Sequence, residues 1–375
     1  MRIGIVGTRG IPNRYGGFEQ FATRLAPFLA RNGHDVLVYN THDHPWKEIE
    51  YEHVSIIHKY NPERILGPAG QFIYDLLCII DSRKRRFDVI LQLGYTSSAV
   101  WGWLIPKSAR LVTNMDGIEY HRAKYSNLVK RFLKFSERLV VKRSDHLIAD
   151  APEIARHLKR RYQVRATYIP YGADIPQDIT DTLPKSLNIR KYEYFLLIAR
   201  MQADNHIETI LKAYTDAQHD YPLVVIGNMD NAYGRQMKLK YNHQGIRYLG
   251  AIFDQPFLNQ LRQYCALYFH GHSAGGTNPS LLEAMACGAP VCAHNNPYNR
   301  HVLDEQGLYF NQADDLAGII QTLPGRESLQ EMGRRGQDRI RSDFSQEKIL
   351  KAYEDLLLQM ATQTRSIQPQ TDFPT

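Results

Sequence analysis

The sequence has only four cysteines in 375 residues, and none of them lies in a Cys-x-x-Cys pair. Cys78, Cys265, Cys287 and Cys292 are scattered, each within an apolar segment. This usage excludes a disulfide-rich secreted domain and a cysteine-ligated metal site, and it predicts reduced, buried thiols in a cytosolic protein.

Long hydrophobic runs are also absent. The most apolar stretch, residues 65–80, is interrupted by Pro68 and Asp75, so it falls short of the roughly 20 apolar residues of a membrane span. The opening MRIGIVGTRG lacks the apolar core and small-residue cleavage site of a signal peptide, and it predicts a first strand instead. We therefore expect a protein that is soluble or peripheral to a membrane.

Metal-ligand spacing is lacking as well. His42-Asp-His44 and His270-x-His272 each place two histidines close together, but neither pair has a third ligand at the spacing of a zinc motif. We expect no bound metal, and we expect His270 and His272 to line a ligand site instead.

The length and charge of the chain suggest two unlike domains. A chain of 375 residues with 43% hydrophobic side chains is too long for one ordinary core. Residues 1–172 carry 27 Lys and Arg against 16 Asp and Glu, a net of +11, whereas the remainder carries 19 against 23, a net of −4. The basic side chains gather in three clusters, which are Arg83–Arg86, the set Lys130, Arg131, Lys134, Arg138, Lys142 and Arg143, and Lys159–Arg161. Such density could attract nucleic acid, an anionic lipid or a lipid diphosphate, or it could be ordinary solvated helix surface.

Apolar runs that suit buried strands alternate with helical segments along both halves. In the first half, strands are expected at Arg2–Gly7, Val36–Tyr39, Phe87–Leu93, Arg110–Asn114 and His146–Ala149, with helices at residues 18–32 and 127–143. In the second half, strands are expected at Tyr194–Ala199, Leu223–Gly227, Ile246–Leu249 and Ala266–Phe269. This alternation predicts an α/β fold with parallel sheets.

Gly4, Gly7 and Gly10 have the spacing of a dinucleotide-binding turn. However, Gly4 lies inside the first strand, and the second strand leads into Asn40 without the acidic residue that binds the ribose of NAD. The better functional pair is Gly16-Gly17, in the loop just before the first helix.

The stretch from His270 to Val291, HGHSAGGTNPSLLEAMACGAPV, combines a strand end, a glycine-rich turn and a helix start. Gly275-Gly276 permits backbone conformations closed to other residues, Asn278 is a good N-cap, and Pro279 suits the first helical position. The uncovered N–H groups and the positive end of the helix dipole suit a phosphate, although such a turn could merely connect a strand to a helix.

Glu283 favours the binding interpretation over the connecting turn. It lies about one helical turn past the cap, beside apolar Leu282 and Met285, where a buried carboxylate needs a partner. The vicinal hydroxyls of a ribose could supply that partner.

The segment SLLEAMACGAPV resembles the donor-site helix of family-4 glycosyltransferases of the GT-B fold, whose hallmark is two glutamates separated by seven residues. Glu283 matches the second glutamate, but the first falls on Gly275, so its role cannot be carried over.

Three further segments carry the same resemblance. YGGFE at residues 15–19 is similar to a loop that lies against the donor diphosphate in this family, and IPYGAD at 169–174 resembles the segment that ends the first domain. Arg200 matches an arginine that grips the diphosphate, whereas Asn205 stands where relatives carry a lysine. Because Asn205 can donate only neutral hydrogen bonds, the phosphate charge must rest on Arg200 and backbone N–H groups.

The resemblance implies an α/β protein of the GT-B fold, in which two Rossmann-like doubly wound domains face each other across a cleft. Residues 1–174 would form an acceptor-binding domain, and residues 175–345 would form a nucleotide-sugar-binding domain. A terminal helix at 346–362 would pack back on the first domain, and residues 363–375 are expected to be disordered.

Candidate site residues follow from the resemblance and from the expected strand ends. The expected donor-binding residues are Gly16, Gly17, Arg200, Asn205, His272, Gly275, Gly276, Thr277, Asn278 and Glu283. Ligands of doubly wound sheets bind beyond the carboxyl ends of strands, which points to the loop after Arg110–Asn114. There we expect Asp116 and Glu119 to act with Arg200 as catalytic residues, and His121, Arg122 and Lys124 to bind the acceptor. Asp116 stands where many relatives carry a histidine.

The implied activity is a retaining, metal-independent transfer of a sugar from a nucleoside-diphosphate sugar, with no other cofactor. MRIGIVGTRGIP, YGGFE and HSAGGTNPSLLEA are similar to a bacterial rhamnosyltransferase subgroup. We therefore expect dTDP-rhamnose as donor and a lipid-linked glycan acceptor of cell-surface polysaccharide synthesis, without nucleic acid as a partner. The expected location is the cytoplasm, at the anionic inner face of the membrane. The alternatives are a GT-B-fold sugar-nucleotide epimerase and a non-catalytic module that binds sugar nucleotides or anionic lipid.

Overall fold

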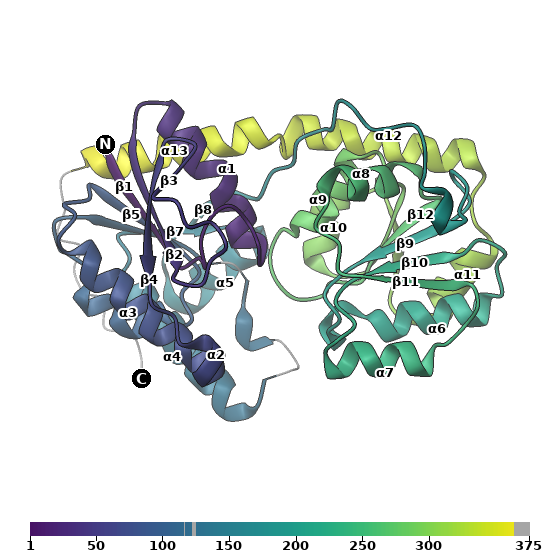
Figure 1. Cartoon of the computed structure of the whole chain (residues 1–375), viewed down its shortest axis with the longest axis horizontal. Helices are drawn as coiled ribbons and strands as arrows, with labels where there is room; N and C mark the ends of the chain where they lie inside the picture. Colours follow the sequence, from purple (N-terminus) through teal and green to yellow (C-terminus); the bar gives the residue numbers. More distant parts are fainter. Residues whose placement is uncertain (116, 122–124, 364–375) are drawn as a thin grey trace. The chain divides into compact units, whose positions relative to one another are not determined.

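The computed structural model describes residues 1–115, 117–121 and 125–363. The chain divides into two compact units (Figure 1). The first unit contains Met1–His121, Tyr125–Pro170 and the chain from Glu347, and the second unit contains Tyr171–Gln346.

The first unit is built on an eight-stranded sheet in the order β3-β4-β2-β1-β5-β6-β7-β8. Neighbouring strands are parallel except β3 and β4, which pair antiparallel. The strands are β1 (Arg2–Val6), β2 (Asp35–Thr41), β3 (Glu50–Tyr51), β4 (Val54–Lys59), β5 (Val89–Leu93), β6 (Arg110–Asn114), β7 (His146–Ala149) and β8 (Thr167–Tyr168). Because both faces of a parallel sheet are covered, β1 and β5 are buried along almost their whole length and are therefore mostly apolar in sequence.

Helices and short 3-10 turns surround this sheet. They are α1 (Gly17–Arg31), α2 (Glu63–Leu66), η1 (Gly67–Ala69), α3 (Gly70–Ser82), η2 (Ser98–Leu104), η3 (Glu119–His121), α4 (Asn127–Arg143), α5 (Pro152–Tyr162) and α13 (Gln346–Thr362). The apolar stripe of α1 at i, i+4 and i+8 is formed by Phe21, Leu25 and Leu29, all buried.

The C-terminal helix α13 packs on the first unit. The ring of Tyr353 is fully buried, with its centroid 4.7 Å from that of Phe21 on α1. The amide of Asn114, at the end of β6, donates to the Tyr353 hydroxyl at 2.7 Å. Glu354 accepts a hydrogen bond of 2.9 Å from Asn32, just after α1. A segment more than 300 residues away in sequence therefore completes the core of the first unit.

The second unit is built on a six-stranded parallel sheet in the order β11-β10-β9-β12-β13-β14. Its strands are β9 (Phe195–Ile198), β10 (Leu223–Ile226), β11 (Ile246–Gly250), β12 (Leu267–His270), β13 (Val291–His294) and β14 (Leu308–Phe310). Its helices and turns are η4 (Lys185–Leu187), η5 (Ala203–Asn205), α6 (Ile207–Ala217), α7 (Ala232–Lys240), α8 (Gln255–Tyr264), α9 (Pro279–Ala286), α10 (Pro297–Leu303), α11 (Ala313–Gln321) and α12 (Arg326–Asp343). The two doubly wound, Rossmann-like domains expected from the sequence are thus confirmed.

The stretch at residues 62–82 forms two helices, which the sequence analysis did not anticipate. Gly67 has φ of +56°, a conformation that suits glycine, and it ends α2 before Pro68. Helix α3 then buries Tyr74 and Asp75 against the sheet side of the unit. No helix in the described part of the chain is long and apolar enough to span a membrane.

Candidate functional site

The order of the second sheet reverses between β9 and β12, which are neighbours although they are far apart in sequence (Figure 1). In doubly wound sheets such a switch point leaves a crevice at the carboxyl ends of the two strands, where ligands bind. The loops that follow β9 and β12 contain most of the predicted donor-binding residues, from Arg200 to Asn205 and from His272 to Asn278. The topology therefore brings these two sequence segments to one edge of the sheet.

The start of α9 has the geometry expected for an anion-binding turn. Asn278 caps the helix, its Oδ1 accepting from the Ser280 N–H at 3.0 Å, and Pro279 is the first helical residue, as predicted. Gly275 has φ of +116°, and no atom lies within 4 Å of the place where a Cβ would stand. Thr277 is buried between them. The start of α9, with the positive end of its helix dipole, is thus positioned to meet negative charge.

The loops after β9 and β12 are tied together. The backbone N–H and the hydroxyl of Ser273 both donate to the Asp204 carbonyl, at 3.1 and 2.9 Å. The His206 Nδ1 lies 2.8 Å from the Gly271 carbonyl, and a Cβ on Gly271 would stand only 2.1 Å from the Asn205 carbonyl oxygen. Gly271 is therefore required by close backbone approach. These contacts fix the position of one loop relative to the other.

Arg200 and Asn205 have different surroundings in this site. Asn205 is buried, and its amide donates to the Arg200 carbonyl at 2.7 Å, closing the turn that precedes α6. The Arg200 side chain is exposed and forms no ion pair with another described residue. The Asn205 amide is thus engaged in a backbone contact, and Arg200 is an exposed cation beside it.

The partner of Glu283 within the chain is Arg262 on α8. The Arg262 guanidinium is only 2% exposed, and its Nη2 forms an ion pair with the Glu283 carboxylate. Its Nη1 donates to the Asn259 Oδ1 at 3.1 Å. The only partner expected from the sequence for this carboxylate is a ribose, and Arg262 is not predicted. A usable sequence signal is the position of Arg262, four residues after Leu258 and next to Leu261, on the core-facing side of an amphipathic helix.

Four histidine rings stack in two pairs close to these loops. The His206 and His294 rings lie 3.9 Å apart, and those of His270 and His272 lie 4.5 Å apart. Burial, reinforced by the neighbouring His206 ring, lowers the pKa of His294 to about 4, and burial lowers the pKa of His270 well below its usual value. These two rings are therefore neutral at pH 7 and add no positive charge to the site.

The first sheet has an equivalent switch point between β1 and β5. The loop after β1 is held by Asn40, whose side chain accepts from the Ile11 N–H at 3.0 Å and donates to the Ile11 carbonyl at 2.8 Å. The buried Glu19 carboxylate accepts from the Arg9 N–H at 2.8 Å. An ideal Cβ on Gly16, the cap of α1, would lie 3.3 Å from the same carboxylate. Glu19 of the YGGFE segment therefore shapes the loop around Gly16-Gly17.

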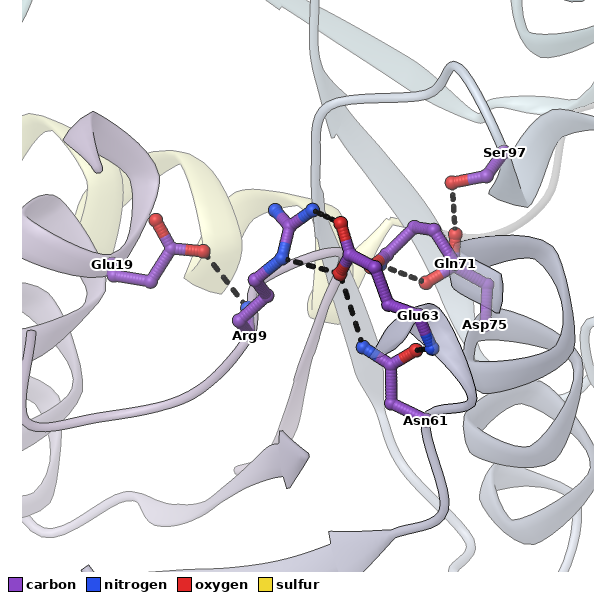
Figure 2. Close-up of polar contacts among 7 residues, drawn as sticks. All are labelled: Arg9, Glu19, Asn61, Glu63, Gln71, Asp75 and Ser97. Atoms are coloured by element: carbon purple, nitrogen blue, oxygen red, sulfur yellow. Dashed lines mark hydrogen bonds and ion pairs between the residues drawn. The ribbon is translucent and has the colours of Figure 1, made fainter. Parts of the chain in front are cut away.

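Figure 2 shows a polar cluster beside this loop that the sequence analysis missed. The Arg9 guanidinium binds Glu63, after β4, through two hydrogen bonds of 2.7 and 3.0 Å. On α3, the buried Asp75 carboxylate accepts from Ser97, after β5, at 2.5 Å and from Gln71 at 3.1 Å. Burial raises the pKa of Asp75 to about 6. The residues come from segments up to 88 positions apart, so sequence spacing gives no signal of the cluster.

The predicted catalytic and acceptor residues after β6 are only partly covered. Asp116, Arg122 and Lys124 lie outside the described residues, and so does the side chain of His121. Glu119 begins η3 and accepts a hydrogen bond of 3.4 Å from the Tyr125 hydroxyl.

The described residues contain no group of three or more His, Cys, Asp and Glu side chains arranged to hold a metal ion. All four cysteines are buried and free. His44, one of the histidines of the first pair, is held by its contacts to the Pro12 carbonyl and the Trp46 N–H instead.

Comparison with known proteins gives two family matches. Residues 1–174 match a domain of unknown function (DUF1972), and residues 179–339 match the family described as glycosyl transferases group 1. The chain is 25% identical to the alpha-monoglucosyldiacylglycerol synthase of Streptococcus pneumoniae, over 88% of this chain and 80% of that protein.

Two solved structures are similar along almost the whole chain. Sucrose-phosphate synthase from Thermosynechococcus elongatus aligns with a TM-score of 0.79 at 20% identity, covering 96% of this chain and 98% of its own. The Anabaena protein HepE, solved in complex with UDP-glucose, aligns with a TM-score of 0.76 at 16% identity, covering 96% and 99%. At these identities the likeness concerns the fold.

Proposed function

Because this chain is a glycosyltransferase of the GT-B fold whose residues 179–339 match the glycosyl transferases group 1, we propose that it transfers rhamnose from dTDP-rhamnose to a lipid-linked glycan. In this proposal the reaction retains the anomeric configuration, needs no metal, and belongs to cell-surface polysaccharide synthesis. The rhamnose donor rests on the subgroup resemblance of the sequence.

The observation that carries the proposal is the pair of linked loops at the second-sheet switch point. They combine the exposed Arg200, the open backbone at Gly275 and the capped start of α9. A nucleoside diphosphate placed there would meet a guanidinium, which can clamp two phosphate oxygens, and several fixed N–H groups. Such preorganised charge stabilises a departing diphosphate. HepE, a structural neighbour, was solved with UDP-glucose, which supports a sugar nucleotide as ligand of this fold.

Glu283 is proposed to bind the donor ribose from the first turns of α9. Its ion pair with the buried Arg262 holds the carboxylate in one orientation. A carboxylate fixed in this way can accept hydrogen bonds from vicinal hydroxyls without first being ordered, which favours binding. His272 and Asn205 complete the proposed donor set on the second unit.

The first unit is proposed to bind the acceptor at the carboxyl edge of its sheet. Asp116, Glu119, His121, Arg122 and Lys124 are the proposed residues after β6. The Arg9–Glu63 pair, which joins the loop after β1 to the segment after β4, adds partly exposed polar groups that suit sugar hydroxyls (Figure 2). The pneumococcal relative is named for a glucosylated diacylglycerol, which supports a lipid as the carrier of the acceptor.

Two other functions make different predictions. An epimerase would isomerise the donor without an acceptor, and a binding module would bind donor without converting it. Thermal melts with a panel of nucleoside diphosphates identify the nucleotide, because a ligand of the folded state raises the melting temperature. Incubation of the chosen donor with and without lipid-linked acceptor then separates the three. Donor consumed only when acceptor is present supports the transferase; donor isomerised or unchanged in both samples contradicts it.

A further inference from the structure

Helix α4 carries an exposed stripe that mixes large apolar and basic side chains. Leu128 and Phe135 are 78% and 53% exposed, although both are large hydrophobic residues. Arg131, Arg138 and Lys142 are also exposed, and the spacing of all five is i, i+3, i+7, i+10 and i+14. This spacing places them along one face of a helix. We call these five residues the α4 stripe.

The charges of α4 all have one sign at the surface. Its only acidic residue is Glu137, which is buried and contacts His157 at 3.0 Å and the Tyr162 hydroxyl at 2.7 Å. The remaining charged residues of the helix are basic, and none of them forms an ion pair with another described residue. They are Lys130, Arg131, Lys134, Arg138, Lys142 and Arg143. The helix therefore presents positive charge that the surrounding fold leaves uncompensated.

The surface next to α4 also exposes a large aromatic side chain. Turn η2 contacts both α3 and α4, and its Trp103 is 61% exposed. The neighbouring Trp101 is anchored by a 2.9 Å hydrogen bond to the Phe72 carbonyl of α3. Phe72 and Phe132 join the two helices, with ring centroids 5.6 Å apart, and α3 and α4 run close together in Figure 1. The α4 stripe thus belongs to a folded, anchored helix, so a partner need not order it.

The combination of side chains favours one class of partner. Nucleic acid would match the basic residues but would gain little from an exposed leucine at the start of the helix and a phenylalanine two turns later. An anionic bilayer matches both, because apolar side chains enter the headgroup region while Arg and Lys meet lipid phosphates. We propose that α4 docks lengthwise on an anionic phospholipid membrane, with Leu128 and Phe135 entering the bilayer surface. This proposal rests on the proposed function in one respect, because a lipid-linked acceptor is the reason why the protein would meet a membrane.

The test is cosedimentation of the full chain with vesicles. The protein is mixed at low salt with vesicles of phosphatidylcholine alone or with about one-third phosphatidylglycerol. We expect binding to the anionic vesicles only, weakened by salt because exposed charges are screened. Leu128→Ser/Phe135→Ser should lose most of the binding. Arg131→Gln/Arg138→Gln should weaken it by roughly an order of magnitude or more, since each basic side chain near the surface is worth roughly fivefold.

A matched control comes from the second unit. Leu239 on α7 is 81% exposed beside the exposed Lys238, so Lys238→Gln/Leu239→Ser removes a similar pair of side chains from another surface. This variant should bind vesicles like the unmodified protein. Absence of binding to anionic vesicles, equal loss in the control, or preferential binding of an oligonucleotide that competes with vesicles would overturn the proposal.

Activity with a water-soluble acceptor analogue separates this inference from the proposed function. The α4 stripe variants should retain full transfer to such an acceptor, because the stripe contains none of the proposed donor or acceptor residues. Vesicle binding by a protein without transferase activity would support the membrane-docking surface and contradict the proposed function.

Discussion

Glu283 and Arg262 form an ion pair in which the arginine side chain is 2% exposed and the glutamate side chain is 16% exposed. The Glu283 carboxylate neutralises the buried guanidinium of Arg262, and it is also proposed to bind a ribose. Substitutions of Glu283 will affect both the stability of the second unit and donor binding, and the two effects must be separated.

We predict that Glu283→Ala strongly destabilises the protein. Removing one partner of a buried ion pair leaves an uncompensated charge, which costs about 3–5 kcal/mol. Thermal or urea unfolding measures this loss. The double variant Arg262→Met/Glu283→Leu serves as the control, because replacing both charges with apolar groups of similar size should recover most of the stability. An unchanged melting temperature for Glu283→Ala would show that the ion pair does not hold the helices together.

The isosteric Glu283→Gln is the variant for donor binding. It keeps the shape of the side chain and an oxygen that can accept from Arg262, so the fold should survive with a smaller loss. Losing a charged hydrogen-bond acceptor for the ribose is worth about 1.5–3 kcal/mol, or one to two decades in affinity. Calorimetric titration with dTDP tests this, and full affinity in the variant would leave Glu283 with its structural role alone.

Arg200→Lys should weaken dTDP binding at least tenfold without changing stability. The side chain is exposed, so the fold does not depend on it, whereas an ammonium cannot reproduce the two-pronged contact of a guanidinium with phosphate oxygens. Arg190→Lys, at another exposed position of the second unit, is the matched control and should bind normally. A mild effect of Arg200→Lys would mean that the backbone N–H groups around Gly275 dominate.

Asn205→Lys should lower stability, although it restores the lysine found in relatives. The Asn205 side chain is buried and donates to the Arg200 carbonyl, and a lysine would lose that bond and need a route to solvent. Leaving a buried carbonyl unpaired costs about 1–3 kcal/mol. Unfolding and dTDP titration of the same variant check this. A stable variant with tighter dTDP binding would show that the turn rearranges easily to admit the charge.

Asp75→Asn should stabilise the protein above pH 6 and have little effect near pH 4. Burial raises the pKa of Asp75 to about 6, so between its ordinary value near 4 and pH 6 the folded state binds more protons than the unfolded state. The contribution of Asp75 to stability therefore falls as pH rises through this window and stays low above it. A shift of this size corresponds to about 2–3 kcal/mol.

The measurement for Asp75 is the difference in unfolding free energy between the two proteins at pH 4.5 and pH 8. Taking the difference cancels the other titrating groups, including His294, whose lowered pKa acts in the opposite direction. Equal or lower stability of Asp75→Asn at pH 8 would show that the hydrogen bonds from Ser97 and Gln71 outweigh the cost of burying the charge.

The sequence predicts those features of this protein that depend on local order along the chain. Buried parallel strands such as β10 are continuous apolar runs, and the start of α9 is marked by Asn278 and Pro279, so both are found at or within one residue of the expected positions. The terminal helix has a long apolar stripe and is also visible in sequence. The short antiparallel pair β3 and β4 is not, because a two-residue strand carries no usable periodicity.

Contacts between distant side chains could not be predicted in the same way. The Arg9–Glu63 and Glu283–Arg262 pairs join residues that share no motif, and their meeting depends on strand order and on the packing of α8 against α9. The direction of the Asn205 side chain is likewise set by a local turn and not by residue type. The loops of the proposed donor site are therefore visible in the sequence, whereas the contacts between side chains within them are seen only in the structure.

The proposed function is best tested by transfer of rhamnose from dTDP-rhamnose to a lipid-linked glycan, followed by nuclear magnetic resonance of the product. We expect that a glycosylated product forms only when donor and acceptor are both present, that the anomeric configuration of the donor is kept, and that Arg200→Lys reduces the rate while Arg190→Lys does not. Donor conversion without acceptor, an inverted product, or equal rates for the two arginine variants would overturn the proposed function.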